Sequence, residues 1–329
     1  MADQNNWPRV AVVGAGAVGG YFGGLLARAG APVVMIGRQS FVDAVRNSGL
    51  FLDTVQFRER VQVEASADLN AARGAELVLF CVKTTDNVST ARALAPLVAP
   101  QAAVLSLQNG VDNAEQIHDA AGLNVISAVV YVAASVPEPG HMKHVGRGDL
   151  VIGPECEKTK RIAELFSRAS IPCRVTDNIQ GELWTKLIWN SALNAISALG
   201  NARYGQVAES AEARELVQTV VNEVLAVAHA AGVVMPNVKT PEDGMAGAMK
   251  IATQMSDAFS STAQDIHRGK RTEIDSLNGY VARRGQELGV PTPANFALYA
   301  MVKLLEQTLA HTAPDPPSNS FHSVSRVTR

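Results

Sequence analysis

Residues 10–30 read VAVVGAGAVGGYFGGLLARAG, a β-branched run that leads through a glycine-rich turn into a helical pattern. Gly14, Gly16 and Gly19 form a G-x-G-x-x-G pattern at the turn. In this pattern the first glycine permits a tight turn, the second lets a pyrophosphate approach the backbone, and the third lets helix and strand pack closely. The context predicts a dinucleotide at the helix amino terminus, although a glycine-rich turn of another α/β protein is the simpler alternative. The residues expected to contact the dinucleotide are Gly14, Ala15, Gly16, Ala17, Val18 and Gly19.

The rest of the first half continues this alternation of strand and helix. A helical pattern covers residues 87–98, and a Gly- and Pro-rich segment at residues 137–155 is typical of hairpin strands and turns. Strands that alternate with helices predict a parallel sheet with helices on its faces. Besides residues 10–14, the expected strands are residues 33–37, 77–82, 103–107 and 125–132.

The character of the sequence changes after residues 173–177, where it becomes rich in Ala and Leu with helical periodicity. We therefore expect an α/β domain with a Rossmann-type, doubly wound parallel sheet over residues 1–178. An all-α substrate-binding domain is expected over residues 179–310. Residues 311–329 are rich in Pro, Ser and Thr and are predicted to be disordered.

Composition excludes several classes of function. The chain has 329 residues, is 47% hydrophobic and carries a formal net charge of −2, so neither a nucleic acid nor a membrane surface is an expected partner. The three cysteines are far apart and show no metal-ligand spacing, which predicts free thiols in a reducing compartment and no metal site. With no signal-peptide pattern and no apolar run of about 20 residues, a cytoplasmic location is expected.

The second predicted strand indicates which dinucleotide is bound. Residues 33–40 read VVMIGRQS, with Arg38 where NAD-dependent enzymes usually place an Asp or Glu. A guanidinium binds a 2′-phosphate, whereas a carboxylate would repel it. NADPH/NADP+ is therefore the expected cofactor, and the alternative is that Arg38 is a solvated loop residue.

Polar residues also follow two other predicted strands. Lys83 follows one in residues 77–84 (LVLFCVKT), and Asn109 follows the next in residues 104–110 (VLSLQNG). Ligands bind open α/β sheets just beyond the carboxyl ends of the strands. Both residues are therefore expected near the nicotinamide and the reacting groups, although each could be an ordinary polar loop residue.

An apolar helix in the second half carries an unusual polar stripe. Residues 183–196 read LWTKLIWNSALNAI, and at 100° per residue Lys186, Asn190 and Asn194 fall within an arc of about 80°. Buried polar groups need partners, so the stripe either packs against another helix or binds a polar ligand. Further along, Ser261 could be a helix cap, and Glu273 is expected in the first turn of a helix that begins near residue 272.

With these motifs in place, the sequence resembles ketopantoate reductases (2-dehydropantoate 2-reductases). GAGAVG, VKT, QNG, LWTKLIWNSALN and SSTAQDIHRGKRTEIDSLNG appear in that family's order, and the resemblance covers residues 9–309. It implies an all-helical second domain like the C-terminal domain of 6-phosphogluconate dehydrogenase. It also allows a homodimer. The implied activity is NADPH-dependent reduction of 2-dehydropantoate to (R)-pantoate, a step of pantothenate biosynthesis.

The resemblance also implies roles for single residues. Lys186 is the implied general acid, and Glu273 lies between cofactor, substrate and Lys186. Such an ammonium would stabilise the negative charge that develops on a carbonyl oxygen during hydride transfer, and could then donate the proton. The implied substrate-binding residues are Lys186, Asn109, Asn190, Asn194 and Ser261. The implied cofactor contacts beyond the glycine loop are Arg38, Lys83, Asn109, Ala133 or Ala134, and Glu273.

Two positions depart from the family pattern. Ala258 and Tyr204 stand where family members have asparagines that can contact substrate. A reductase of another branched 2-oxo acid, or a dehydrogenase of a hydroxy acid or imine, therefore stays open as an alternative. A non-catalytic NADP(H) sensor is the alternative from a different class.

Overall fold

The strand that leads into the glycine-rich turn is an inner strand of a ten-stranded sheet, third from the β5 edge. The computed structural model describes residues 7–312, and in it strand β1 (Val10–Val13) is buried between β2 (Val33–Ile36) and β6 (Leu77–Phe80). β1 runs parallel to both neighbours. Because the chain passes from β1 to β2 on one side and reaches β6 on the other, the connections diverge beside β1. A crevice at the carboxyl ends of such strands is the usual ligand position in open α/β sheets.

The other strands extend the sheet in the order β4-β3-β9-β8-β7-β6-β1-β2-β5, with β10 paired to β9. Strands pair in parallel except for β8 with β9 and β3 with β4. The remaining strands are β3 (Leu50–Asp53), β4 (Arg58–Val61), β5 (Glu64–Ser66), β7 (Ala103–Ser106), β8 (Val125–Glu138), β9 (His141–Gly153) and β10 (Cys173–Val175).

Helices cover both faces of this sheet. Successive side chains of a strand point to opposite faces, and those of β1, β2 and β6 are buried on both, so each face needs a covering layer. Val10 and Val12 pack with side chains of α1, α2 and α5, whereas Ala11 and Val13 pack with side chains of α3 and α4. The predicted doubly wound, Rossmann-type sheet is thus confirmed. The helices are α1 (Ala17–Arg28), α2 (Gln39–Ser48), α3 (Asn87–Leu94), α4 (Asn113–Ala121) and α5 (Glu157–Arg168).

All five predicted strands are present, but the sheet is larger than predicted. β8 continues to Glu138 and turns into β9 through residues 139–140, where Gly140 has a φ of 76°. β3, β4 and β5 were not predicted from the sequence. They are three or four residues long. The edge strands β4 and β5 read RERV and EAS, so they lack the continuous apolar run that marks a buried strand, and the apolar part of β3 is only three residues long.

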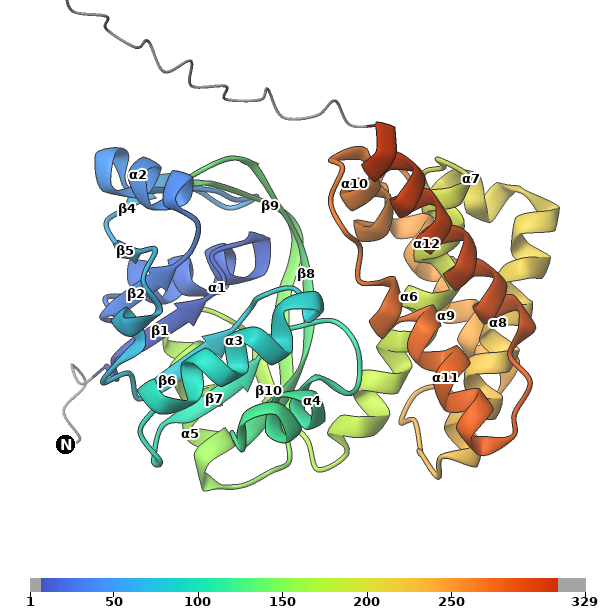
Figure 1. Cartoon of the computed structure of the whole chain (residues 1–329), viewed down its shortest axis with the longest axis horizontal. Coiled ribbons are helices and arrows are strands. Elements are labelled where there is room, and N and C mark those ends of the chain that lie inside the picture. Colours follow the sequence, from blue (N-terminus) through green and yellow to red (C-terminus); the bar gives the residue numbers. More distant parts are fainter. Residues whose placement is uncertain (1–6, 313–329) are drawn as a thin grey trace, which may run out of the picture.

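Seven helices form the second half of the described chain, and Figure 1 shows them gathered beside the long strands β8 and β9. α6 lies at their centre, and its buried residues share one apolar cluster with Val129 of β8 and Val151 of β9. This cluster joins the helices to the sheet and confirms the predicted helical character of this half. The helices are α6 (Ile179–Leu199), α7 (Tyr204–Glu209), α8 (Ala211–Ala230), α9 (Pro241–Gln254), α10 (Ser261–His267), α11 (Asn278–Leu288) and α12 (Pro293–Thr312).

Short 3-10 turns complete the described elements, and one of them, η4, lies close to the candidate site. α12 continues to Thr312, and the rest of the segment predicted to be disordered lies outside the described residues. Within residues 7–312, no helix combines the length and the apolar character that crossing a membrane requires. The turns are η1 (Leu69–Ala72), η2 (Thr84–Asp86), η3 (Ala95–Leu97) and η4 (Ile274–Ser276).

The glycine-rich turn gives the first prediction. A methyl group added at Gly19 would overlap the Gly14 carbonyl oxygen and lie 2.9 Å from Val12 Cγ1, whereas one added at Gly16 would meet nothing within 4 Å. We expect Gly19→Ala to lower the free energy of unfolding by about 1–3 kcal/mol, the usual effect of overpacking. Gly16→Ala is the matched control and should change it by less than about 0.5 kcal/mol. Urea denaturation measures both, and equal values would show that helix–strand contact does not require Gly19.

Candidate active site

Lys186 projects from the buried helix α6 toward the carboxyl edge of the sheet. Its ammonium donates a hydrogen bond to Asn109 Oδ1 at 2.8 Å and another to the Val130 carbonyl oxygen of β8. It also lies 5.8 Å from the centre of the Tyr131 ring. Burial lowers the pKa of Lys186 to about 8, and the negative charge of Glu273 opposes that shift. The lysine is therefore a cation at neutral pH and a stronger acid than a lysine in water.

Asn109 connects this ammonium to a carboxylate. Its Oδ1 accepts from Lys186, while its Nδ2 donates to Glu273 Oε2 at 3.1 Å. Glu273 Oε1 also accepts from the backbone N–H of Thr84 at 3.3 Å. The cluster brings together α6, the loops after β6 and β7, and the segment before η4. Three positions singled out in the sequence are thus joined by hydrogen bonds.

The predicted helix beginning near residue 272 is wrong. Glu273 precedes the short η4, and α11 begins only at Asn278, because Leu277 (φ −111°, ψ −106°) interrupts the helical path. Thr272 Oγ1 accepts from the backbone N–H of Ile274 at 3.2 Å and fixes the start of the turn. This irregular backbone directs the Glu273 carboxylate toward Asn109 and Thr84 rather than along a solvated helix face.

Lys83 connects the sheet to the helical half of the chain. Its ammonium forms an ion pair with Asp265 of α10 at 2.6 Å and donates to the Arg271 carbonyl oxygen at 2.9 Å. Ala133 and Ala134 are half-buried in β8, beside irregularities in its pairing with β9, and they follow Val130 on the same strand. Sequence reasoning missed Asp265, Thr84 and Val130. The last two act through backbone atoms, which carry no side-chain signal.

The far end of the polar stripe has a second hydrogen-bonded group. Asn194 is only 2% exposed; its Oδ1 accepts from Tyr204 Oη at 2.8 Å, and its Nδ2 donates to Ser261 Oγ at 3.5 Å. Ser260, not Ser261, caps α10, since Ser260 Oγ accepts from the N–H of Ala263. Ser261 is exposed, and Asn190 is half-buried with no side-chain hydrogen bond within residues 7–312.

The glycine-rich loop has the shape expected of a phosphate-binding turn. Gly14 has a φ of 105°, and a side chain there would collide with the backbone of Cys81. Gly16 borders open space, so a ligand can approach its backbone directly. Arg38 is exposed at the start of α2, just past β2, and its guanidinium makes no hydrogen bond or ion pair within the described part of the chain. These features fit a dinucleotide cofactor.

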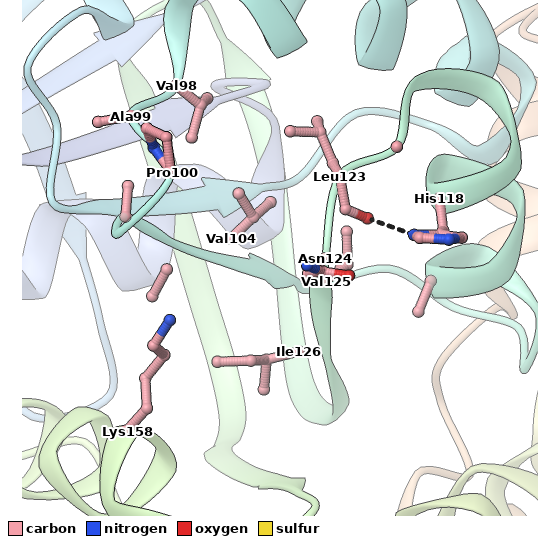
Figure 2. A pocket seen from close by; sticks show the side chains of 14 residues that line it. Val98, Ala99, Pro100, Val104, His118, Leu123, Asn124, Val125, Ile126 and Lys158 are labelled. Carbon is pink, nitrogen blue, oxygen red and sulfur yellow. Dashed lines mark hydrogen bonds between the residues drawn. The ribbon is translucent and has the colours of Figure 1, made fainter.

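A separate cavity of about 520 Å³ lies at the opposite edge of the sheet (Figure 2). Its lining includes the first residues of β7 and β8, so it opens at the amino ends of these strands, away from Asn109. Ligands of open α/β sheets bind at carboxyl ends, and we do not assign this cavity to the reaction. The labelled lining residues are Val98, Ala99, Pro100, Val104, His118, Leu123, Asn124, Val125, Ile126 and Lys158.

The sheet is doubly wound and has a glycine-rich first turn, and the helices place a buried lysine at its carboxyl edge. This combination is typical of oxidoreductases that use a dinucleotide cofactor. Comparison with known proteins gives the family. The chain belongs to the ketopantoate reductase family: the model "Ketopantoate reductase PanE/ApbA" matches residues 10–155, and "Ketopantoate reductase PanE/ApbA C terminal" matches residues 178–306.

Individual relatives agree with this assignment. The 2-dehydropantoate 2-reductase of Pyrococcus horikoshii is 33% identical over 91% of this chain and 97% of its own. A crystal structure of a PanE/ApbA family ketopantoate reductase from Ralstonia eutropha is 47% identical, covers 92% of this chain and 100% of its own, and has a TM-score of 0.87. A D-mandelate dehydrogenase is 23% identical with a TM-score of 0.85, a likeness of fold alone.

The cluster predicts how Lys186 titrates. Because the Glu273 carboxylate stabilises the ammonium, Glu273→Gln should lower the pKa of Lys186 below its value of about 8. Nuclear magnetic resonance of lysine labelled with carbon-13 at Cε follows this titration directly. Glu242→Gln, at an exposed position in the first turn of α9, is the matched control and should leave the pKa unchanged. An unchanged or higher pKa in Glu273→Gln would show that the carboxylate does not act on Lys186.

Proposed function

We propose that the protein reduces 2-dehydropantoate (ketopantoate) to (R)-pantoate with NADPH, as a step of pantothenate biosynthesis. The observation that carries the proposal is the chain of hydrogen bonds from Lys186 through Asn109 to Glu273 at the carboxyl edge of the sheet. Support comes from relatives named 2-dehydropantoate 2-reductase that match about nine-tenths of the chain.

In this proposal the glycine loop holds the pyrophosphate and Arg38 binds the 2′-phosphate. Open space at Gly16 supports this assignment, as does the guanidinium of Arg38, which has no hydrogen bond or ion pair among residues 7–312. Once bound, NADPH supplies the hydride. Lys83, Asn109, Glu273 and Ala133 would line its nicotinamide half, since they lie at or near the same edge of the sheet. The loop residues are Gly14, Ala15, Gly16, Ala17, Val18 and Gly19.

Lys186 then acts as general acid. An ammonium has three N–H donors; two point to Asn109 Oδ1 and the Val130 carbonyl oxygen, which leaves the third for the ketone oxygen of a 2-oxo acid. It stabilises the negative charge that develops on that oxygen and donates the proton. With a pKa of about 8 the acid form is present below pH 8, so turnover should fall as the pH rises through that value. Glu273 favours the acid form.

The remaining stripe residues would bind the rest of the substrate. At about 1.5 Å of rise per residue, Asn190 and Asn194 lie about 6 and 12 Å from Lys186 along α6. Asn190 offers an amide without a hydrogen-bond partner in the described residues, and Ser261 offers an exposed hydroxyl. These neutral groups can bind carboxylate and hydroxyl oxygens without repelling a substrate anion.

One observation favours a second candidate, a reductase of another branched 2-oxo acid. The two departures from the family pattern are neighbours: the N–H of Tyr204 donates to the carbonyl oxygen of Ala258 at 3.0 Å. Together they change one region near the substrate end of the site. A spectrophotometric panel of 2-oxo acids with NADPH decides between the candidates by the ratio of kcat/KM values. A protein that bound NADPH and turned over none of them would be a sensor.

The proposal also includes a cytoplasmic enzyme that forms a homodimer. The free thiols of Cys81, Cys156 and Cys173 support a reducing compartment. Exposed apolar side chains on α12 support self-association, since Phe296 is 60% exposed and Leu304 54% exposed.

The role of Lys186 gives the main kinetic prediction. Lys186→Ala should lower kcat with 2-dehydropantoate by about two or more orders of magnitude, the usual scale of a lost general acid. The Kd of NADPH should change by less than about twofold, because the residues proposed to hold the phosphates lie at the starts of α1 and α2 and not on α6. The matched control is Lys160→Ala on α5, where the ammonium pairs with Glu155 at the surface. Turnover that survived in Lys186→Ala would refute the assigned role.

Arg38 gives the prediction on cofactor choice. Arg38→Ala should lower the preference for NADPH over NADH by about tenfold or more, since a charged contact to a phosphate contributes about 1.5–3 kcal/mol. Steady-state kinetics with both cofactors measure the ratio of kcat/KM values. Arg161→Ala, at an exposed position of α5, serves as control. An unaltered ratio in Arg38→Ala would show that the 2′-phosphate binds elsewhere.

A further inference from the structure

Tyr204, Asn194 and Ser261 form a chain of hydrogen bonds that runs from the core of the helices to the surface. Tyr204 is 8% exposed, Asn194 is 2% exposed and Ser261 is exposed. Tyr204 Oη lies 2.8 Å from Asn194 Oδ1, and Asn194 Nδ2 lies 3.5 Å from Ser261 Oγ. Ser261 is the member of this chain most accessible to a ligand.

The direction of this chain determines what Ser261 can do. If the amide oxygen of Asn194 faces Tyr204, its NH2 group donates to Ser261 Oγ, and the Ser261 hydrogen is free for a ligand. In the reversed amide the Ser261 hydroxyl would donate to Asn194, and only lone pairs would remain. The two orientations therefore make Ser261 a donor or an acceptor toward the ligand.

Tyr204 selects the first orientation. A phenol oxygen shares its lone pair with the ring, so the hydroxyl is a better donor than acceptor. Burial raises the pKa of Tyr204, which keeps its proton in place. The ring is held in the apolar cluster of the helices, and the Tyr204 N–H is bonded to Ala258, so the hydroxyl is fixed against Asn194.

We propose that Tyr204 is a positioning residue that acts through Asn194 to make the Ser261 hydroxyl a hydrogen-bond donor to an acceptor oxygen of the substrate. A 2-oxo acid suits such a site because its carboxylate and ketone oxygens only accept hydrogen bonds at neutral pH. The inference rests on the proposed function, since it takes the 2-oxo acid as the ligand. It gives a role to a position where the sequence departs from the family pattern.

The test removes one hydroxyl. Tyr204→Phe should raise the KM for 2-dehydropantoate about two- to tenfold, the range of one net hydrogen bond. It should leave kcat within about twofold, because Tyr204 acts about 12 Å along α6 from Lys186. The KM for NADPH should not change. Tyr280→Phe is the matched control: Tyr280 is partly buried, and its hydroxyl has no hydrogen bond in the described residues.

A double variant separates positioning from packing. Ser261→Ala should raise the KM by a similar factor, and Tyr204→Phe combined with Ser261→Ala should raise it no further, because both act on one bond. If the two effects multiply, or if Tyr204→Phe keeps the wild-type KM, the inference is overturned.

A further variant, Asn194→Asp, tests the same chain of hydrogen bonds if Tyr204→Phe fails to fold. Asn194→Asp has the same shape but only accepts, so it takes the Ser261 hydrogen and should raise the KM more than tenfold; an unchanged KM would contradict the proposed chain. Wild-type protein that reduces no 2-oxo acid overturns the proposed function, and this inference with it. Active wild-type protein with no response to Tyr204→Phe overturns the inference alone.

Discussion

The site depends on a positive charge that is buried on an otherwise apolar helix. The ammonium of Lys186 is desolvated on α6, and an unpaired charge in such surroundings would be strongly destabilising. Its partners come from the sheet: the side chain of Asn109 and the carbonyl oxygen of Val130. The helices can therefore hold this lysine as a cation only while they pack against the sheet, so the same contacts that stabilise the charge also fix the position of α6 against the sheet.

The topology explains why groups distant in sequence meet there. Parallel strands end at one edge, so the loops after β1, β6 and β7 bring Gly16, Lys83 and Asn109 to the same crevice. The helical half adds Lys186 from α6 and Glu273 from an irregular segment. The side-chain amide of Asn109 connects the Lys186 ammonium to the Glu273 carboxylate, so the two charges form no direct ion pair. A direct ion pair would use the N–H donor that a ketone oxygen needs.

Much of this arrangement could be predicted from the sequence. The apolar run before the glycine-rich turn predicted β1, and similar runs predicted β2 and β6, because parallel strands covered on both faces are continuously apolar. The stripe on α6 predicted that Lys186, Asn190 and Asn194 share a face. Short edge strands such as β4 gave no such signal, and the break at Leu277 depends on backbone angles that the apolar pattern does not reveal. The partnership of Tyr204 with Asn194 required the packing of α7 against α6, which no local pattern encodes.

A crystal structure of the protein with NADP+ and pantoate would test the role of Lys186. We expect Lys186 Nζ within about 2.6–3.2 Å of the C2 oxygen of pantoate, the range in which a general acid can transfer a proton, with its bonds to Asn109 and Val130 retained. A lysine separated from that oxygen by more than about 4 Å, with no bridging water, would show that Lys186 is not the general acid.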